Sequence, residues 1–277
     1  MDLRGWENWV GGCFFSGRGK WGGLVFLNHE GRVGGGVVEA RLALGCQGDF
    51  ARGSIRMSKQ FFDGIEWEAE VKYSGRPLDV VMSFATGEEM DRIGAWGDYA
   101  DYGESRLSRD QKEILEYASL LGGMYRVYDA NERFAASANR LERIIRENPR
   151  EDVLFALIMR MSAAAAGKIS APFANDEILG FAAMRHTWKN TVKLEFLAVN
   201  PSHKGTGMEI RGVGGLLLAA SVEISEMLSA PMFWAECTET SLGFYRKQKF
   251  ATLEDIVFLD AAGIEGFLEA KNKEGAS

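Results

Sequence analysis

The chain has 277 residues, a length that suggests two domains or one domain with a large extension. Hydrophobic residues make up 46% and charged residues 26%, as in ordinary soluble globular proteins. The net charge of −7 argues against nucleic acid as a partner, because phosphate contacts require a basic face. Three widely spaced cysteines provide neither a disulfide framework nor a metal-binding pair, and the chain has three histidines, so no metal site is expected.

Neither the first residues nor the apolar runs of the sequence lead us to expect a targeting or membrane segment. The first residues lack a basic segment followed by an apolar run, so no signal peptide is expected. No stretch of 18 apolar residues occurs, so no membrane span is expected either. These observations predict a cytoplasmic protein that does not interact with membranes.

Composition changes near residue 108. Residues 1–108 are rich in glycine and aromatic residues, and short alternating runs such as 65–73 and 78–84 lie between the glycines. Alternation at period two is typical of half-buried strands, and several short strands with frequent turn residues are typical of an antiparallel barrel or sandwich. The sequence therefore predicts an N-terminal antiparallel β domain over residues 1–108.

The second part, residues 109–277, begins with helical patterns over 110–148. We expect a break at Gly122-Gly123, then a second helix over 131–147 that ends before Pro149. From residue 152 strands and helices alternate, which predicts a mixed α/β domain and makes the whole chain α+β. The expected strands are 153–159, 177–184, 191–199, 232–237 and 256–259, and the expected helices are 212–228 and 241–248.

Residues 191–250 carry the pattern that points to a chemistry. An apolar strand ends at Val199-Asn200-Pro201, and a glycine-rich loop, 205–215, leads into the apolar run Leu216-Leu217-Leu218 of the expected helix. Free backbone N–H groups and the helix dipole at such a junction bind phosphate without help from side chains. The loop matches neither the Walker nor the dinucleotide-binding fingerprint, and a simple turn is the alternative interpretation.

This segment resembles the GNAT superfamily of acyl-CoA-dependent N-acetyltransferases, over about residues 110–262. The resemblance rests on Val199-Asn200-Pro201, on Lys204-Gly205-Thr206-Gly207, on 211–218 and on 245–250. Two positions depart from the family pattern: Glu209 stands where Arg or Gln is usual, and Lys249 stands where Gly is usual. The loop is also longer than the family pattern.

The resemblance implies acetyl-CoA as co-substrate and a set of residues that bind it. The N–H groups of Val213, Gly214 and Gly215 would hold the pyrophosphate, and Gly212 would permit its close approach. The strand residues Leu197, Ala198 and Val199 would pair with the pantetheine arm like an added strand. Thr238 and Ser241 take the places of the family's usual Asn and Ala in the motif that includes Tyr245.

Two side chains are the candidate catalytic groups. In the family, a tyrosine at the position of Tyr245 protonates the departing thiolate, and the neutral phenol suits that step. Glu195 lies on a mostly apolar strand, where partial burial would raise its pKa toward the range of a general base. The alternatives are a structural tyrosine and a solvent-facing glutamate.

Helices 110–148 would line the acceptor pocket by the same resemblance, with Tyr125, Tyr128, Arg133 and Phe134 as candidate contacts. The N-terminal region faintly resembles a small calycin-type barrel, in which a strand would end at Ile93-Gly94-Ala95-Trp96.

The function expected from the sequence is transfer of acetyl from acetyl-CoA to a primary amine of a small molecule or peptide by direct attack. A non-catalytic acyl-CoA sensor or scaffold and a ligand-binding barrel with a supporting GNAT-like domain stay open as alternatives. Because family members often dimerise, a homodimer also stays open.

Overall fold

The computed structural model describes residues 67–73, 76–98, 109–162, 177–200 and 210–275. Most of the expected N-terminal β domain and the loop residues 201–209 lie outside this part of the chain.

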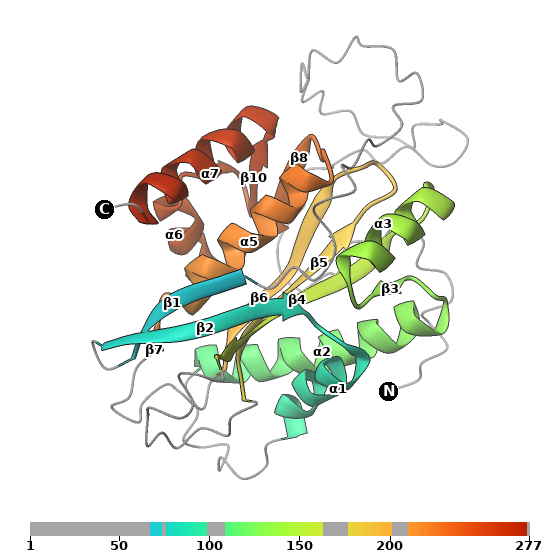
Figure 1. Ribbon diagram of the computed structural model, residues 1–277, viewed down its shortest axis with the longest axis horizontal. Helices are drawn as coiled ribbons and strands as arrows, with labels where there is room; N and C mark the ends of the chain where they lie inside the picture. The colour runs from blue at the N-terminus through green and yellow to red at the C-terminus, as the bar shows by residue number, and fades with distance from the viewer. Residues whose placement is uncertain (1–66, 74–75, 99–108, 163–176, 201–209, 276–277) are drawn as a thin grey trace. The chain divides into compact units, whose positions relative to one another are not determined.

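One mixed sheet of ten strands organises the described residues (Figure 1). Its strand order is β7-β1-β2-β4-β5-β6-β8-β10-β9, and the short β3 pairs in parallel with β4. Most neighbouring strands are antiparallel, whereas β6 and β8 run parallel. The strands are β1 (Trp67–Tyr73), β2 (Arg76–Phe84), β3 (Phe134–Ala135), β4 (Val153–Met161), β5 (Ile178–His186), β6 (Val192–Val199), β7 (Ile210–Arg211), β8 (Met232–Glu236), β9 (Ala251–Leu253) and β10 (Ile256–Asp260).

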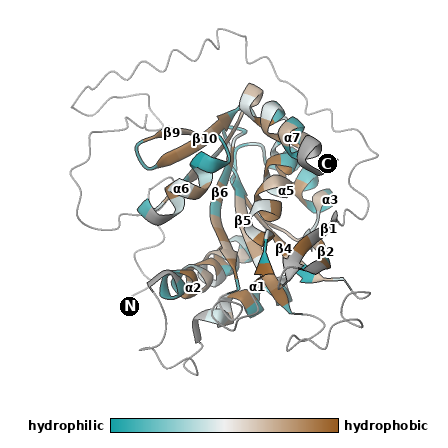
Figure 2. Cartoon of the chain, turned by 90° about the vertical axis from the view of Figure 1, so that its left-hand side faces the viewer, coloured by the Kyte–Doolittle hydropathy of each residue, from teal (hydrophilic) through white to brown (hydrophobic). Residues whose placement is uncertain are grey.

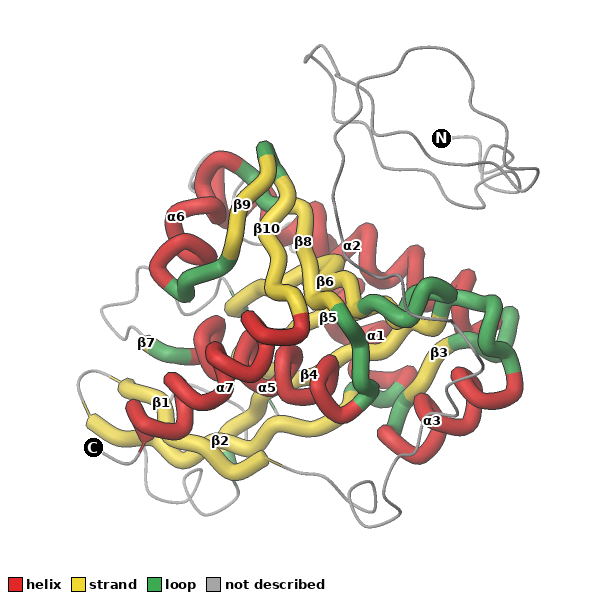
Figure 3. The backbone as a smooth tube through the Cα atoms, turned by 90° about the horizontal axis from the view of Figure 1, so that it is seen from above, coloured by secondary structure: helices red, strands yellow, loops and turns green. Residues whose placement is uncertain are grey.

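Helices cover both faces of this sheet (Figures 1 and 3). On one face, α3, α5, α6 and α7 contribute to a cluster that includes Leu141, Leu217, Tyr245 and Phe267. On the opposite face, α1, α2 and the 3-10 helix η2 contribute to a second cluster around Met90, Leu121 and Trp96. The helical bounds are α1 (Gly87–Gly94), η2 (Ala95–Asp98), α2 (Arg109–Ala130), α3 (Ala138–Glu147), α5 (Val213–Met227), α6 (Glu239–Lys247) and α7 (Ala261–Gly275).

The long apolar runs of the sequence form the central strands of the sheet, which are buried on both faces. Val153 to Met159 on β4 are all fully buried, and alternate side chains enter the two clusters. Figure 2 shows the same distribution, with brown hydrophobic positions along the sheet and on the inner sides of the helices. A strand between two helical layers needs apolar residues at consecutive positions, as β4 has.

The boundary predicted at residue 108 is not a boundary in this fold. Strand β2 pairs with β4 from Val80↔Met161 to Phe84↔Leu157, and β1 pairs with both β2 and β7. Residues before and after 108 therefore share one sheet. The expected strand end at Ile93-Gly94-Ala95-Trp96 is also wrong, because this segment ends α1 and begins η2.

The helical region 110–148 differs from its prediction at the glycine pair. Helix α2 continues through Gly122 and Gly123 to Ala130. A Cβ on Gly122 would lie 3.0 Å from the Cα of Gly94, so the missing side chain lets α1 and α2 approach closely. The second helix, α3, begins only after its N-cap Ser137, whose side chain accepts a hydrogen bond from the N–H of Arg140. Phe134, predicted on that helix, lies on β3 instead.

The remaining strands and helices of residues 153–260 fall close to their predicted positions, whereas α1, α7, β3, β7 and β9 were not predicted. Among the described residues, no helix is both long and apolar enough to cross a membrane.

Candidate active site

The parallel strands β6 and β8 separate part of the way along their length. They pair at Val192↔Phe233, Lys193↔Trp234 and Leu194↔Ala235. Beyond this point β6 continues to Val199, whereas β8 ends at Glu236. Leu197, Ala198 and Val199 keep their pairing with β5 on one side, and no described strand pairs with them on the other. We call this opening between β6 and β8 the fork.

A β-bulge lies where the fork begins. On β5, Ala183 pairs with Phe196 and the next residue, Met184, pairs with Leu194, so Glu195 is an extra residue on β6. The bulge interrupts the alternation of side chains. Phe196 packs against the cluster beneath α1 and α2, and Glu195 contacts Arg185 and Lys193.

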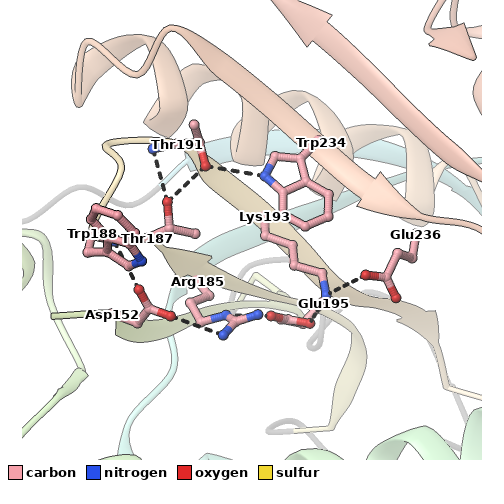
Figure 4. Close-up of polar contacts among 9 residues, drawn as sticks. All are labelled: Asp152, Arg185, Thr187, Trp188, Thr191, Lys193, Glu195, Trp234 and Glu236. Carbon is pink, nitrogen blue, oxygen red and sulfur yellow. Dashed lines mark hydrogen bonds and ion pairs between the residues drawn. The ribbon is translucent and has the colours of Figure 1, made fainter. Parts of the chain in front are cut away.

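Glu195 is the centre of a row of alternating charges (Figure 4). Its Oε1 accepts a hydrogen bond from Arg185 Nε at 2.6 Å, and its Oε2 lies 3.1 Å from Lys193 Nζ. Arg185 also contacts Asp152 Oδ2 at 3.0 Å, and Lys193 also contacts Glu236 Oε1 at 3.1 Å. We call these five residues, in the order Asp152, Arg185, Glu195, Lys193 and Glu236, the charge row. The Glu195 side chain is only 10% exposed, which excludes the alternative of a solvent-facing glutamate.

Burial and neighbouring charges act in opposite directions on Arg185. Burial lowers the pKa of its guanidinium, but Glu195, Tyr128 and Asp152 outweigh burial and raise the pKa above its usual value. For the phenol of Tyr128 the two effects are reversed: burial raises its pKa, and the nearby Arg185 lowers it. Tyr128, expected on the acceptor side, therefore does lie beside the charge row.

Two tryptophans flank the same row (Figure 4). The ammonium of Lys193 lies 5.0 Å from the centre of the Trp234 ring, within the range of a cation–π interaction. At the other end, the backbone N–H of Trp188 donates to Asp152 Oδ1 at 2.9 Å. Asp152, at one end of the row, and Lys193, next to its other end, are thus each held by a further contact.

The N-terminus of α5 lies next to the free end of β6. Gly212, the N-cap, has a φ of 102°, a left-handed conformation that suits glycine, and no side chain caps the helix there. The first helical hydrogen bond runs from the N–H of Leu216 to the carbonyl of Gly212, which leaves the N–H groups of Val213, Gly214 and Gly215 outside the helical ladder. A Cβ on Gly214 would lie 3.9 Å from Val199 Cγ2. These N–H groups suit a pyrophosphate.

Gly180 on β5 lets α5 pack closely against the sheet. A Cβ there would lie 2.7 Å from Val213 Cγ1 and 2.8 Å from the carbonyl oxygen of Ala198. The first turn of α5 is therefore held against β5 and β6.

Tyr245 lies on the opposite side of the sheet from Glu195. Its ring is 6% exposed, in the cluster beneath α5 and α7, with edge contacts to Phe244 and Phe250. Burial raises the pKa of Tyr245, with a further contribution from Cys237 at the end of β8. The side chains of Thr238 and Ser241 form the capping box of α6, which gives both residues a structural role.

The other expected acceptor contacts have structural partners. Arg133 pairs with Glu151 at 2.6 Å, and Tyr125 packs edge-on against Phe134. Conversely, sequence reasoning missed Arg185 and Lys193. Arg185 and Lys193 carry the same signal that singled out Glu195, a charged residue on an apolar strand.

A parallel strand pair that separates beside the N-terminus of a glycine-rich helix is suited to an extended ligand that carries phosphate. Comparison with known protein families indicates which class of protein this part of the chain resembles. Residues 138–250 match the family model described as the acetyltransferase (GNAT) family. This stretch is a GNAT acetyltransferase domain.

Solved structures of acetyltransferases are similar to the chain at low identity. Nourseothricin acetyltransferase is 17% identical, with a TM-score of 0.27 over 38% of this chain and 62% of that chain. A GNAT family acetyltransferase from Brucella melitensis, in complex with acetyl-CoA, is 15% identical, with a TM-score of 0.38 over 66% of this chain and 88% of that one. The PaiA N-acetyltransferase from Thermoplasma acidophilum, in complex with coenzyme A, is 14% identical, with a TM-score of 0.34 over 64% of this chain and 96% of that one. No curated protein matches the chain significantly.

Proposed function

We propose that the protein transfers acetyl from acetyl-CoA to a primary amine, with the thioester held in the fork between β6 and β8. The single observation that carries this proposal is the end of β6–β8 pairing at Leu194↔Ala235, next to the first turn of α5. Acetyl-CoA supplies an activated acetyl group. The family match of residues 138–250 supports the same chemistry.

The residues around the fork fit this co-substrate. The N–H groups of Val213, Gly214 and Gly215, which lie outside the helical ladder, would hold the pyrophosphate at the positive end of the α5 dipole. The edge of Leu197 to Val199 with which no described strand pairs would bind the amide groups of the pantetheine arm, as an exposed strand binds a peptide.

The two sides of the sheet would then have different tasks. The charge row with Glu195 lies on the side of α2, where we place the amine and the carboxylate that receives its proton. Tyr245 lies on the side of α5 and α6, where it would donate a proton to the leaving thiolate. Its raised pKa keeps the phenol protonated at neutral pH, as a proton donor requires.

A thiol-release assay with a panel of primary amines tests this function. We expect release of free CoA thiol that depends on a primary amine and is absent with a tertiary amine of similar size. Tyr245→Phe is expected to lower kcat by about 100-fold, the usual contribution of a general acid, while the affinity for acetyl-CoA is kept.

Two results would count against the proposal. Binding of acetyl-CoA without amine-dependent thiol release would identify a sensor or scaffold. Full activity in Tyr245→Phe would remove the role assigned to Tyr245 and leave the transfer reaction itself intact.

A further inference from the structure

We propose that Glu236, at the end of β8, is the carboxylate that accepts the proton of the acceptor amine, and that Glu195 is a positioning residue. This inference rests on the proposed function. It differs from the expectation for Glu195, because the two carboxylates have different access to an incoming molecule.

Both oxygens of Glu195 are already bound to cations. Arg185 Nε lies 2.6 Å from Oε1 and Lys193 Nζ lies 3.1 Å from Oε2, and the side chain is 10% exposed. A general base must present a lone pair to the proton at hydrogen-bond distance. Each oxygen keeps a second lone pair, but burial and the two adjacent cations hinder the approach of an amine, and displacement of either cation would leave it without its partner.

Glu236 has the free oxygen that Glu195 lacks. Its Oε1 contacts Lys193 Nζ at 3.1 Å, and within the described residues its Oε2 makes no hydrogen bond or ion pair. The side chain is 37% exposed and belongs to the last residue of β8, where the fork opens. Its neighbour Ala235 packs into the cluster on the α5 side, so alternation places Glu236 on the α2 side with Lys193.

The distribution of charge along the row also favours Glu236. Three carboxylates, Asp152, Glu195 and Glu236, alternate with the two cations Arg185 and Lys193, which leaves one net negative charge. At the Asp152 end both oxygens are occupied, one by Arg185 and the other by the N–H of Trp188. The less compensated charge is therefore at Glu236, where it would attract an ammonium group.

Lys193 connects the two roles. Its ammonium contacts Glu195 and Glu236 and lies over the Trp234 ring, so it holds the Glu236 carboxylate in a fixed direction (Figure 4).

In the transfer step, the amine nitrogen forms a bond to the acetyl carbon and the C–S bond breaks. Glu236 accepts the proton lost from nitrogen, and Tyr245 gives a proton to the thiolate.

The test compares Glu236→Gln with Glu195→Gln, and Glu239→Gln is the matched control. Glu239 lies three residues further on, in the first turn of α6, and its replacement removes the same charge nearby. Thiol release with a primary amine is measured across pH. We expect Glu236→Gln to lower kcat by about 100-fold or more and to abolish the fall in rate at acidic pH. Glu195→Gln should lose less activity and keep the pH profile, as should Glu236→Asp, which retains a carboxylate.

A second measurement does not depend on turnover. The same amine is titrated calorimetrically into the CoA-bound protein, and we expect weaker binding to Glu236→Gln than to Glu239→Gln. If Glu236→Gln keeps the wild-type rate and pH profile, or if Glu195→Gln has the larger loss, the assignment of Glu236 is overturned. If the wild type itself releases no thiol with any amine, the proposed function fails instead.

Discussion

Arg185 Nε donates to Glu195 Oε1 at 2.6 Å, across a β-bulge that makes Glu195 the unpaired residue of β6. The contact joins the strand that forms the fork to its neighbour β5, and through Asp152 it reaches the start of β4. It fixes the direction of a charged side chain at the position where β6 and β8 separate.

Replacement of Arg185 by Met is expected to lower the free energy of unfolding by about 3 kcal/mol, because two partly buried carboxylates lose their shared partner. Arg126→Met is the control. Its pair with Asp91 is 3.9 Å long and exposed, so its loss should change stability by less than about 0.5 kcal/mol. Urea unfolding measures both, and equally small effects would show that the buried pair does not stabilise the fold.

Neighbouring glycines on α2 are expected to respond in opposite directions to alanine. Gly123→Ala meets no atom within 4 Å and should stabilise the helix by up to about 1 kcal/mol. Gly122→Ala places its Cβ 3.0 Å from the backbone of Gly94 and should destabilise the protein by about 1 kcal/mol or more, because α1 must move. Thermal unfolding of the two variants tests this. Equal stability would mean that the crossing of α1 and α2 is loose.

The buried imidazole of His186 is expected to make the folded protein less stable in mild acid. The side chain is 4% exposed, its Nε2 lies 3.0 Å from Asn190 Oδ1, and its Nδ1 has no hydrogen-bond partner among the described residues. Burial lowers its pKa, against a smaller opposing effect of the Asn190 hydrogen bond. The unfolded chain therefore binds the proton first, so this stability is complete above the unfolded pKa and is lost as the pH falls below it.

The expected slope for this one group is at most about 1.4 kcal/mol per pH unit below about pH 6.5. His186→Gln should reduce the slope of unfolding free energy in that range. An identical slope in the variant would assign the acid sensitivity to other groups.

Local patterns predicted the elements around the fork, and long-range pairing determined what was missed. Strand β6 and helix α5 were identifiable because their hydrophobic period and the glycine-to-helix junction lie within a short segment. The bulge at Glu195 depends on the register of β6 against β5, which the sequence of β6 alone does not contain. The charge row joins residues that lie 33 and 43 positions apart in the sequence, Asp152 with Arg185 and Lys193 with Glu236.

The boundary predicted at residue 108 was wrong for a related reason. A change in composition suggested a new domain there, yet β2 finds its partner β4 across that change. The roles of Thr238 and Ser241 illustrate the opposite case. Their spacing is that of a capping box, a local signal that explains both residues without a ligand.

The central claim is that acetyl-CoA binds at the fork with its pyrophosphate on the first turn of α5. Calorimetric titration of acetyl-CoA into the wild type, Gly214→Glu and Gly266→Glu tests it most directly. Position 214 has room for a side chain, but a carboxylate there would repel phosphate at the helix N-terminus, whereas Gly266 lies on α7 and serves as the control. The account predicts micromolar binding to the wild type and to Gly266→Glu, and none to Gly214→Glu. Absence of binding to the folded wild type at millimolar acetyl-CoA, or unchanged binding to Gly214→Glu, would contradict it.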